Sequence, residues 1–259
     1  MKSNILFTVT DLNIIDKLKD LGIKNFVYPL SFFCVGIPNT FEINQIKEDN
    51  SYLYINENLA TKKIDNLEKI LNNLPNNIKG VIFEDLGIIR LLKDKNLEKI
   101  LFNPHFNSNY ETINYMFKYV DEIILPLDLT YEEIKEIVAK TNKKVSIMTF
   151  GLISSMYSRR TLLKSHSKHY NIPYKDTLKL KVNNENFLAF ENENGTVLYH
   201  YPYYNGSILK NLDIKYELYL PLFLNNNQVL NTIDNIQSIE IDDGFLNKKT
   251  IYKIRKEQK

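Results

Sequence analysis

The sequence predicts an α/β protein in which a single (β/α)₈ TIM-like barrel is distorted by a β-hairpin inserted before its last βα unit. Short apolar runs rich in β-branched and aromatic residues alternate with amphipathic stretches, which is the pattern of βα units around a parallel sheet. Eight such runs occur, the number that a parallel barrel requires. With 259 residues, the chain is long enough for one domain of this size.

The expected strands are short and consist mostly of Val, Ile, Leu, Phe and Tyr. We place them at residues 5–9, 26–30, 52–55, 80–83, 100–102, 122–125, 144–148 and 216–220. The expected helices repeat apolar residues at spacings of three and four, so that one stripe faces the sheet, as Leu67 and Leu71 do. These helices are expected at residues 12–21, 43–47, 62–74, 88–93, 111–119, 131–139 and 229–236.

Three polar residues are expected to begin helices. Asp11 precedes an apolar residue, Ser108 lies three residues before an acidic residue, and Thr130 lies three residues before Glu133. The last two have the spacing of a capping box, in which two side chains satisfy free backbone N–H groups. These signals indicate where three of the expected helices begin.

The rhythm breaks after Tyr157, where a basic and polar stretch begins. Two strand-like runs follow within residues 185–200, and Asn194-Gly195 between them is a frequent turn in β-hairpins. We therefore expect a barrel domain over residues 1–240 that contains this hairpin as an insertion. Residues 241–259 are expected to form a C-terminal strand, at residues 250–254, and a charged tail.

Charge and composition exclude several classes of protein. Thirty-three basic residues against 31 acidic ones give a net charge of +2, so the chain lacks the strong overall field of a protein that wraps nucleic acid. A single cysteine, Cys34, excludes an intramolecular disulfide and any all-cysteine metal or iron–sulfur site built from this chain. No apolar run approaches the roughly 20 residues that span a bilayer, so we expect a cytoplasmic protein without a membrane segment.

Three segments carry a family resemblance. They are GVIFEDLGIIRL at residues 80–91, IILPLDLTYEEI at residues 123–134 and IMTFGLISSMYSRR at residues 147–160. In this order and at these separations they resemble signatures of the peptidase U32 family, a group of barrel proteins named for collagenase-like activity. The stretch 28–44 resembles an early segment of the same family, and the likeness extends to about residue 240.

The chain also departs from the family pattern. Members with an iron–sulfur cluster have four cysteines near and beyond the third segment, whereas this chain has Thr161 at a position where a cysteine is common. We therefore expect no cluster and no metal in this chain, because threonine and isolated histidines do not replace thiolates as iron ligands. The resemblance implies that a short, cysteine-poor member works beside a larger paralogue that carries the cluster.

If the barrel forms, chemistry should lie on the loops that follow the strands, where they converge on one mouth. The weak catalytic candidates are Glu84, His105 and Asn107. Each follows a strand and can transfer a proton or form a hydrogen bond to a ligand. His105 also has an ordinary explanation as a loop histidine that caps a helix. Of Glu84 and Asp85 at most one would point inward, because adjacent residues of a strand face opposite sides. No orienting carboxylate can be assigned to His105 from the sequence.

A basic stretch is the second candidate. Residues 159–181 contain seven basic residues and one acidic residue, Asp176, and nearby tyrosines could stack on unpaired bases. A charge run is also commonly a solvated surface loop. Of the two arginines that follow the third segment, we expect one to be buried against a carboxylate such as Glu84 or Asp128 and the other to face a ligand. The RNA-binding candidates are Tyr157, Ser158, Arg159, Arg160, Lys164 and Tyr174.

Two functions from different classes remain open on this basis. The resemblance implies a cluster-free partner subunit in RNA hydroxylation, at the tRNA wobble uridine or in rRNA. It also implicates prephenate as a source for this hydroxylation, used through the complex with the partner. The alternative is a stand-alone peptidase that hydrolyses peptides. The loss of charged residues at Tyr219-Leu220-Pro221-Leu222-Phe223, where the family usually has Glu-Gly-Arg, favours an accessory subunit over an independent protease.

Overall fold

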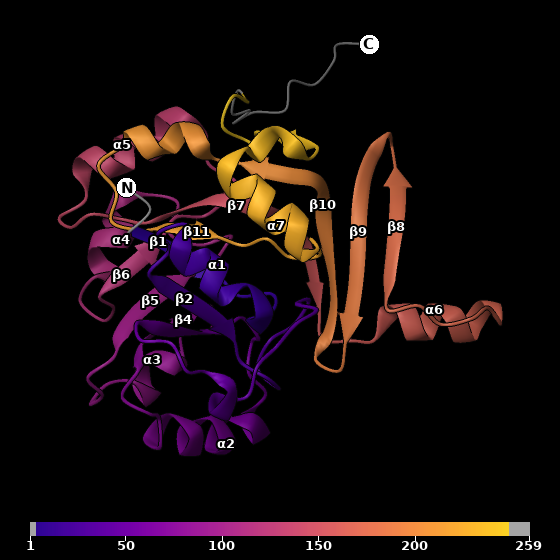
Figure 1. Ribbon diagram of the computed structural model, residues 1–259, viewed down its shortest axis with the longest axis horizontal. Helices are drawn as coiled ribbons and strands as arrows, with labels where there is room; N and C mark the ends of the chain where they lie inside the picture. The colour runs from indigo at the N-terminus through magenta and orange to yellow at the C-terminus, as the bar shows by residue number, and fades with distance from the viewer. Residues whose placement is uncertain (1–3, 249–259) are drawn as a thin grey trace, which may run out of the picture.

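The computed structural model describes residues 4–248 and shows a rounded body from which a second, smaller part projects (Figure 1). The body is built on parallel strands, and most of them lie close to the positions expected from the sequence. These strands are β1 (Ile5–Thr8), β2 (Asn25–Pro29), β3 (Ser51–Ile55), β4 (Ile78–Phe83), β5 (Glu98–Phe102), β6 (Glu122–Ile124), β7 (Ile147–Ser158) and β11 (Glu217–Tyr219).

The body strands form one curled sheet in the order β6-β5-β4-β3-β2-β1-β11-β7. Each pair of neighbours in this order is parallel, for example Phe7 of β1 with Phe26 of β2. Between β6 and the residue before β7 the pairing is a single bridge, Ile124 to Ser146, with Ser146 donating its N–H to Ile123 at 2.8 Å. The sheet therefore curls strongly, and its two ends meet through one short contact.

Helices cover this sheet unevenly. They are α1 (Ile15–Asp20), α2 (Thr61–Asn72), α3 (Ile88–Leu91), α4 (Tyr110–Met116), α5 (Tyr131–Lys140) and α7 (Asn226–Asp234), with 3₁₀ turns at Leu12–Ile14, Ile43–Gln45, Ser207–Asn211 and Ile236–Ser238. The expected helix at 43–47 is only a 3₁₀ turn, and α3 is a single turn. The prediction of an α/β fold is thus confirmed, with a curled sheet of parallel strands. A full (β/α)₈ barrel with a regular ring of helices is not confirmed in the described residues.

The helix starts follow the expected capping chemistry with one exception. Thr130 and Glu133 form the capping box at the start of α5, and Asp11 accepts the N–H of Asn13. Helix α4, however, begins after Asn109, whose Oδ1 accepts the N–H of Thr112 at 2.9 Å. The prediction of Ser108 as the cap was wrong by one residue, because asparagine caps a helix as well as serine does.

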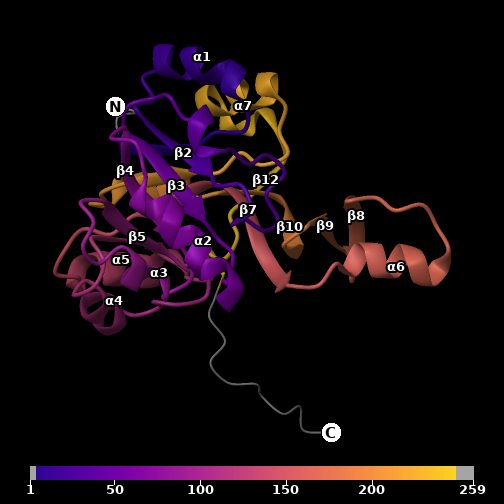
Figure 2. The ribbon, with the colours of Figure 1, turned by 90° about the horizontal axis from the view of Figure 1, so that it is seen from below.

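The projecting part consists of residues 159–201, which we call the wing (Figures 1 and 2). Strand β7 has 12 residues and runs out of the body, so its second half pairs antiparallel with β10 (Gly195–Asn205). Strand β9 (Glu185–Asn192) pairs with β10 around Asn194-Gly195, which confirms the hairpin. Strand β8 (Thr177–Val182) and helix α6 (Leu162–Tyr170) complete the wing.

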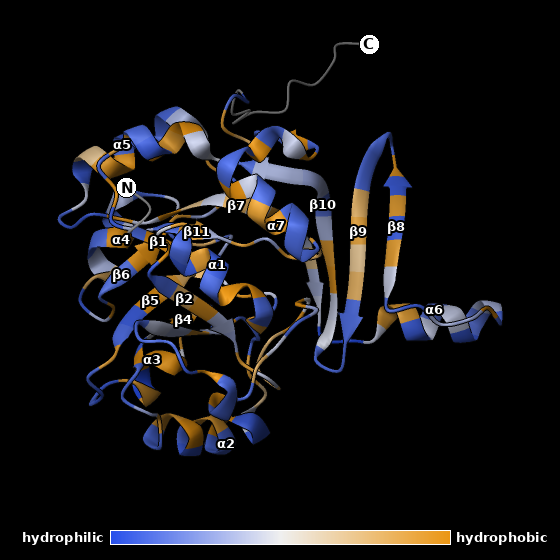
Figure 3. Cartoon of the chain, in the orientation of Figure 1, coloured by the Kyte–Doolittle hydropathy of each residue, from blue (hydrophilic) through white to orange (hydrophobic). Residues whose placement is uncertain are grey.

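Strand β8 was not expected from the sequence. Its turn into β9 passes through Asn183 and Asn184, with φ angles of 49° and 67°. Two successive residues with positive φ are typical of a type I′ hairpin turn, and asparagine is one of the residues that tolerate this conformation. Hydrophobic and hydrophilic residues alternate along β8 (Figure 3). An Asn-Asn pair directly after an alternating run was therefore the signal for a second hairpin.

The C-terminal part of the described chain returns to the wing side of the sheet. Strand β12 (Ile241–Asp242) pairs in parallel with β10 through Tyr203 and Ile241. The expected strand at 250–254 and the charged tail lie outside the described residues. Within residues 4–248, each helix is too short or too polar to cross a membrane.

Candidate functional site

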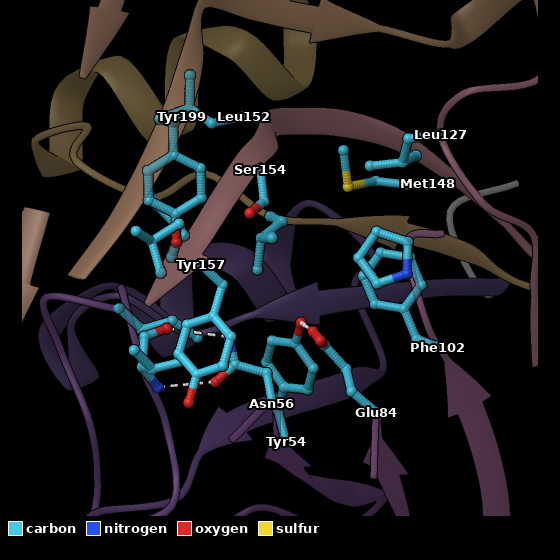
Figure 4. A pocket seen from close by; sticks show the side chains of 16 residues that line it. Tyr54, Asn56, Glu84, Phe102, Leu127, Met148, Leu152, Ser154, Tyr157 and Tyr199 are labelled. Atoms are coloured by element: carbon cyan, nitrogen blue, oxygen red, sulfur yellow. Dashed lines mark hydrogen bonds between the residues drawn. The ribbon is translucent and has the colours of Figure 1, made fainter. Parts of the chain in front are cut away.

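A small cavity lies where the body strands end and β7 and β10 leave the sheet (Figure 4). Its volume is about 50 Å³, room for a few water-sized groups. Apolar residues form most of its wall, including Phe102, Leu127 and Met148. Polar side chains enter it from several elements, namely Tyr54, Asn56, Glu84, Ser154, Tyr157 and Tyr199.

Glu84 is the carboxyl group of this cavity. It follows β4 directly, and the Tyr54 hydroxyl donates a hydrogen bond to its Oε1 at 3.0 Å. Burial raises the pKa of the Glu84 carboxyl from 4.5 to about 8, because the charged form loses its hydration, and the Tyr54 hydrogen bond only partly offsets this. At neutral pH Glu84 is therefore mostly protonated, so it can donate a hydrogen bond as well as accept one.

Tyr157 also belongs to this cavity. It lies on β7 opposite Val197 of β10, and both residues face the cavity. Its hydroxyl is buried and has no hydrogen-bond partner among residues 4–248. Asn56, in contrast, is fully engaged: its Oδ1 accepts the N–H of Val35 at 2.8 Å and its Nδ2 donates to the carbonyl of Val35 at 3.0 Å. The free hydroxyl of Tyr157 is thus available to a guest molecule.

The other catalytic candidates lie elsewhere. His105 is exposed on the loop after β5, and Asn107 is buried there with a φ of 65° and an unpaired Nδ2. Neither residue lines the cavity, although Pro104 of the same loop does. The structure therefore does not bring His105 or Asn107 together with Glu84 around this space.

Cys34 is held as a buried structural thiol. Its Sγ donates to the carbonyl of Tyr54 at 3.0 Å, and burial raises the pKa of the thiol to about 12. Of the histidines, His200 lies 3.8 Å from a carboxylate oxygen of Glu185, and His166 and His169 pack against the ring of Tyr170. No histidine hydrogen-bonds to a serine or cysteine side chain within residues 4–248, and no cluster of metal-binding side chains occurs there.

The basic stretch lies on the wing. Arg159 and Arg160 connect β7 to α6, and both are exposed. In the described part of the chain neither arginine forms an ion pair, so the expectation that one is buried against Glu84 or Asp128 was wrong. The reason is the length of β7, which continues out of the body and carries both arginines away from those carboxylates.

Glu191 fixes the start of α6, although nothing in the sequence marked it. Its carboxylate is buried and accepts the N–H groups of Leu163 at 2.6 Å and Lys164 at 3.0 Å. The Thr196 hydroxyl donates to the same group at 2.7 Å. A carboxylate at this place satisfies free N–H groups and complements the positive end of the helix dipole.

A second polar anchor joins the wing to the body. The ammonium of Lys63, on α2, donates to the carboxylate of Glu57 and to Oδ1 of Asn194 at 2.6 Å. Asn194 in turn donates through Nδ2 to the carbonyl of Cys34 at 2.8 Å. The turn of the β9–β10 hairpin is thereby tied to the loop after β2, which holds the wing beside the cavity.

The wing presents positive charge with aromatic rings. Tyr170 and Tyr174 have exposed fractions of 63% and 48%. The basic residues between β7 and α6, on α6, in the following loop and on β8 are exposed as well. Ser158, the RNA-binding candidate before them, is only partly exposed. The exposed basic residues are Arg159, Arg160, Lys164, Lys168, Lys175, Lys179 and Lys181.

Comparison with one solved structure supports the fold. The structure of the U32 peptidase Mk0906 aligns with a TM-score of 0.51 at 13% identity, over 86% of this chain and 94% of its own. The Bacillus cereus spore cortex-lytic enzyme SleL aligns with a TM-score of 0.35 at 11% identity, over 92% of this chain and 74% of its own. Comparison with curated protein sequences gives no match.

Comparison with protein families gives one assignment that covers more than half of the chain. The model of peptidase family U32 matches residues 31–186, from the end of β2 to the start of β9. All three segments that carry the resemblance, at 80–91, 123–134 and 147–160, lie inside this range. The likeness beyond residue 186 has no such support. The chain belongs to peptidase family U32.

Proposed function

We propose that this chain is the RNA-binding, cluster-free subunit of a U32 system that hydroxylates RNA, with the tRNA wobble uridine as the target. The observation that carries the proposal is the exposed basic surface of the wing. It brings seven cationic side chains and two exposed tyrosines into one projecting part of the molecule. Cationic side chains neutralise phosphates, and tyrosine rings stack on unpaired bases.

The oxidation chemistry belongs, in this proposal, to a larger U32 paralogue with an iron–sulfur cluster. The single thiol of this chain is buried and hydrogen-bonded to Tyr54, so it is not available as a cluster ligand. Prephenate, which the family resemblance implicates, would be used by the complex. This chain would contribute the surface that holds the RNA in place.

The lack of a paired nucleophile and base in the described residues gives the peptidase alternative less support. Ser154 lies in the cavity, but its neighbours there include a carboxylic acid that is mostly protonated at neutral pH and several tyrosines, not a free base. A nucleophilic serine needs a base within hydrogen-bonding reach. We expect the purified chain to leave gelatin and short peptides uncleaved.

RNA binding by the purified chain tests the proposal directly. We expect unmodified tRNA to bind with an affinity that falls steeply as salt rises, because each neutralised phosphate releases counterions. The double variant Arg159→Gln/Arg160→Gln should bind about tenfold more weakly, since two phosphate contacts are lost. The control is Lys17→Gln/Lys24→Gln, which removes the same charge from exposed positions on and after α1, outside the wing.

Two results would overturn this function. One is a wild-type chain that binds tRNA no better than the arginine variant does. The other is co-purification from the native host that recovers no partner with iron, as measured by mass spectrometry and an iron assay. Equal losses of tRNA affinity in the wing variant and in the control would show that the interaction is nonspecific charge attraction.

A further inference from the structure

A groove separates the inner face of the wing from the body. Its volume is about 630 Å³, and it lies between the sheet β8–β9–β10 and the loop that joins β11 to α7. This volume is within the range of pockets that hold small organic ligands, roughly 300 to 1,000 Å³. The groove is separate from the cavity around Glu84, because the two share no lining residue.

The strand register places two lysines and a tyrosine on the groove side of the wing sheet. Lys179 lies opposite Leu188, and Lys181 lies opposite Asn186, which in turn lies opposite Tyr201. Paired residues of neighbouring strands share one face of a sheet, so these side chains point into the groove together. The ammonium of Lys179 lies 5.7 Å from the centre of the Tyr201 ring, a cation–π contact.

Phe223 forms the wall on the body side. Its backbone has a φ of 64°, which is rare for a bulky residue and needs support from its surroundings. The ring packs edge-on against Phe190 at 5.2 Å and Tyr199 at 5.9 Å between ring centres. The Tyr203 hydroxyl also donates to the carbonyl of Leu222 at 2.6 Å, which fixes the loop to β10. Both walls of the groove are therefore held in place.

The charge of the groove selects the class of ligand. Its lining includes Lys179 and Lys181 and no aspartate or glutamate. Aromatic rings with cations and without acidic groups fit a flat, electron-rich ring that is linked to anionic groups. An unstacked nucleobase with its flanking phosphates has this chemistry.

We propose that this groove binds an unpaired base of single-stranded RNA, with Tyr201 as the stacking ring and Lys179 and Lys181 on the neighbouring phosphates. The inference rests on the proposed RNA-binding function and assigns to the groove the selection of single-stranded over duplex RNA. The exposed outer lysines of the wing would contribute attraction to any RNA backbone. Only the groove would need an unpaired base, because a base must leave the stack of the helix to enter it.

The test compares labelled single-stranded RNA of about 12 nucleotides with a duplex of the same length. We expect Tyr201→Leu to weaken single-strand binding about tenfold, with little effect on duplex binding, because the stacking ring is lost. Tyr201→Phe keeps the ring and should keep the affinity. Lys179→Gln/Lys181→Gln should lower the salt dependence of single-strand binding by about 1.4 in log–log slope, for two lost phosphate contacts.

The matched control is Lys168→Gln/Lys175→Gln, which removes the same charge from wing residues outside the groove. This control should weaken binding of single strands and duplexes alike. A 2-aminopurine base in the single strand gives a second readout, since stacking on Tyr201 changes its fluorescence. We expect that change in the wild type and in Tyr201→Phe but not in Tyr201→Leu, with circular dichroism to show that each variant is folded.

The outcomes separate the two proposals. If the wild type binds RNA but Tyr201→Leu and the groove lysine variant behave like the wild type on single strands, the groove assignment is wrong and the RNA-binding function stands. The groove assignment is also wrong if these variants lose duplex and single-strand binding equally. If the wild type binds neither RNA, both proposals are wrong.

Discussion

The body and the wing of this protein are stabilised in different ways. Every residue of β1 and β3 in the body is buried, whereas β8 in the wing has four exposed residues out of six. Parallel strands covered on both faces bury apolar side chains along their whole length, but an outlying antiparallel sheet has fewer such contacts. The body is therefore held by its core, while the wing has a smaller buried apolar face, on β9 and β10, and depends more on its polar anchors.

Those anchors are Glu191 and Lys63. Glu191 holds the start of α6, and Lys63 holds the turn of the β9–β10 hairpin. Each is at least partly buried and binds several partners at once. Loss of one anchor should therefore disturb the wing while the body keeps its fold, and loss of a core residue should unfold the whole chain. The following experiments test this difference.

The largest effect is expected in the core of the body. Phe83 is fully buried at the end of β4, so Phe83→Ala should lower the free energy of unfolding by about 3 to 5 kcal/mol through lost transfer energy and a new cavity. Phe187→Ala is the matched change in the wing, where the ring is only half-buried, and it should cost about 1 kcal/mol. Urea unfolding measures both, and equal losses would contradict the comparison.

The anchor of α6 should have the next largest effect. Glu191→Ala leaves the N–H groups of Leu163 and Lys164 without their acceptor, at a cost of about 3 kcal/mol. Glu191→Gln retains an acceptor oxygen and should cost less. Hydrogen exchange should show faster exchange in α6 and unchanged exchange in β3. If α6 stays protected in Glu191→Ala, the carboxylate is not the anchor.

Stability of the body should depend on pH through Glu84. The unfolded chain releases the proton of Glu84 near pH 4.5. The folded protein holds this proton up to about pH 8, because burial raises the pKa of the carboxyl. Stability should therefore be highest below pH 4.5 with respect to this group and fall as pH rises toward 8, by at most about 1.4 kcal/mol per pH unit. Thermal unfolding across this range measures the slope.

Glu84→Gln is the control for that pH dependence, since glutamine does not titrate. It should remove the slope between about pH 7 and 8 and about half of the slope below pH 7. The remaining slope below pH 7 comes from Glu122, because burial also raises the pKa of that carboxyl to about 7 despite the nearby Lys215. A wild-type slope that Glu84→Gln leaves unchanged would mean that Glu84 is charged in the folded protein.

The smallest effect on stability is expected at the two arginines of the wing. Arg159 and Arg160 are exposed and without ion pairs in the described residues, so Arg159→Ala and Arg160→Ala should each change stability by less than about 0.5 kcal/mol. RNA affinity should fall in both. Melting temperatures that drop strongly in either variant would show that the arginine supports the fold.

The strands of the body could be predicted from the sequence alone. Apolar periodicity is a local signal, and it predicted the short parallel strands. Two other local signals, the capping box at Thr130 and the Asn194-Gly195 pair, predicted the start of α5 and the hairpin. A single cysteine likewise predicts that this chain alone does not supply the four thiolates of an iron–sulfur cluster. The position of Glu84 after a strand was enough to bring it to the strand ends, where the cavity lies.

The construction of the wing, in contrast, depends on contacts that form only in the folded protein. Residues 144–148 gave no sign that β7 would extend to Ser158, because the second half of β7 exists through its pairing with β10. That pairing turns Tyr157 into the cavity and carries Arg159 and Arg160 out of it. The contacts that fix the wing join residues far apart in the chain, such as Lys63 with Asn194. Local patterns carry no information about such pairs, since their energy arises only when the two segments meet.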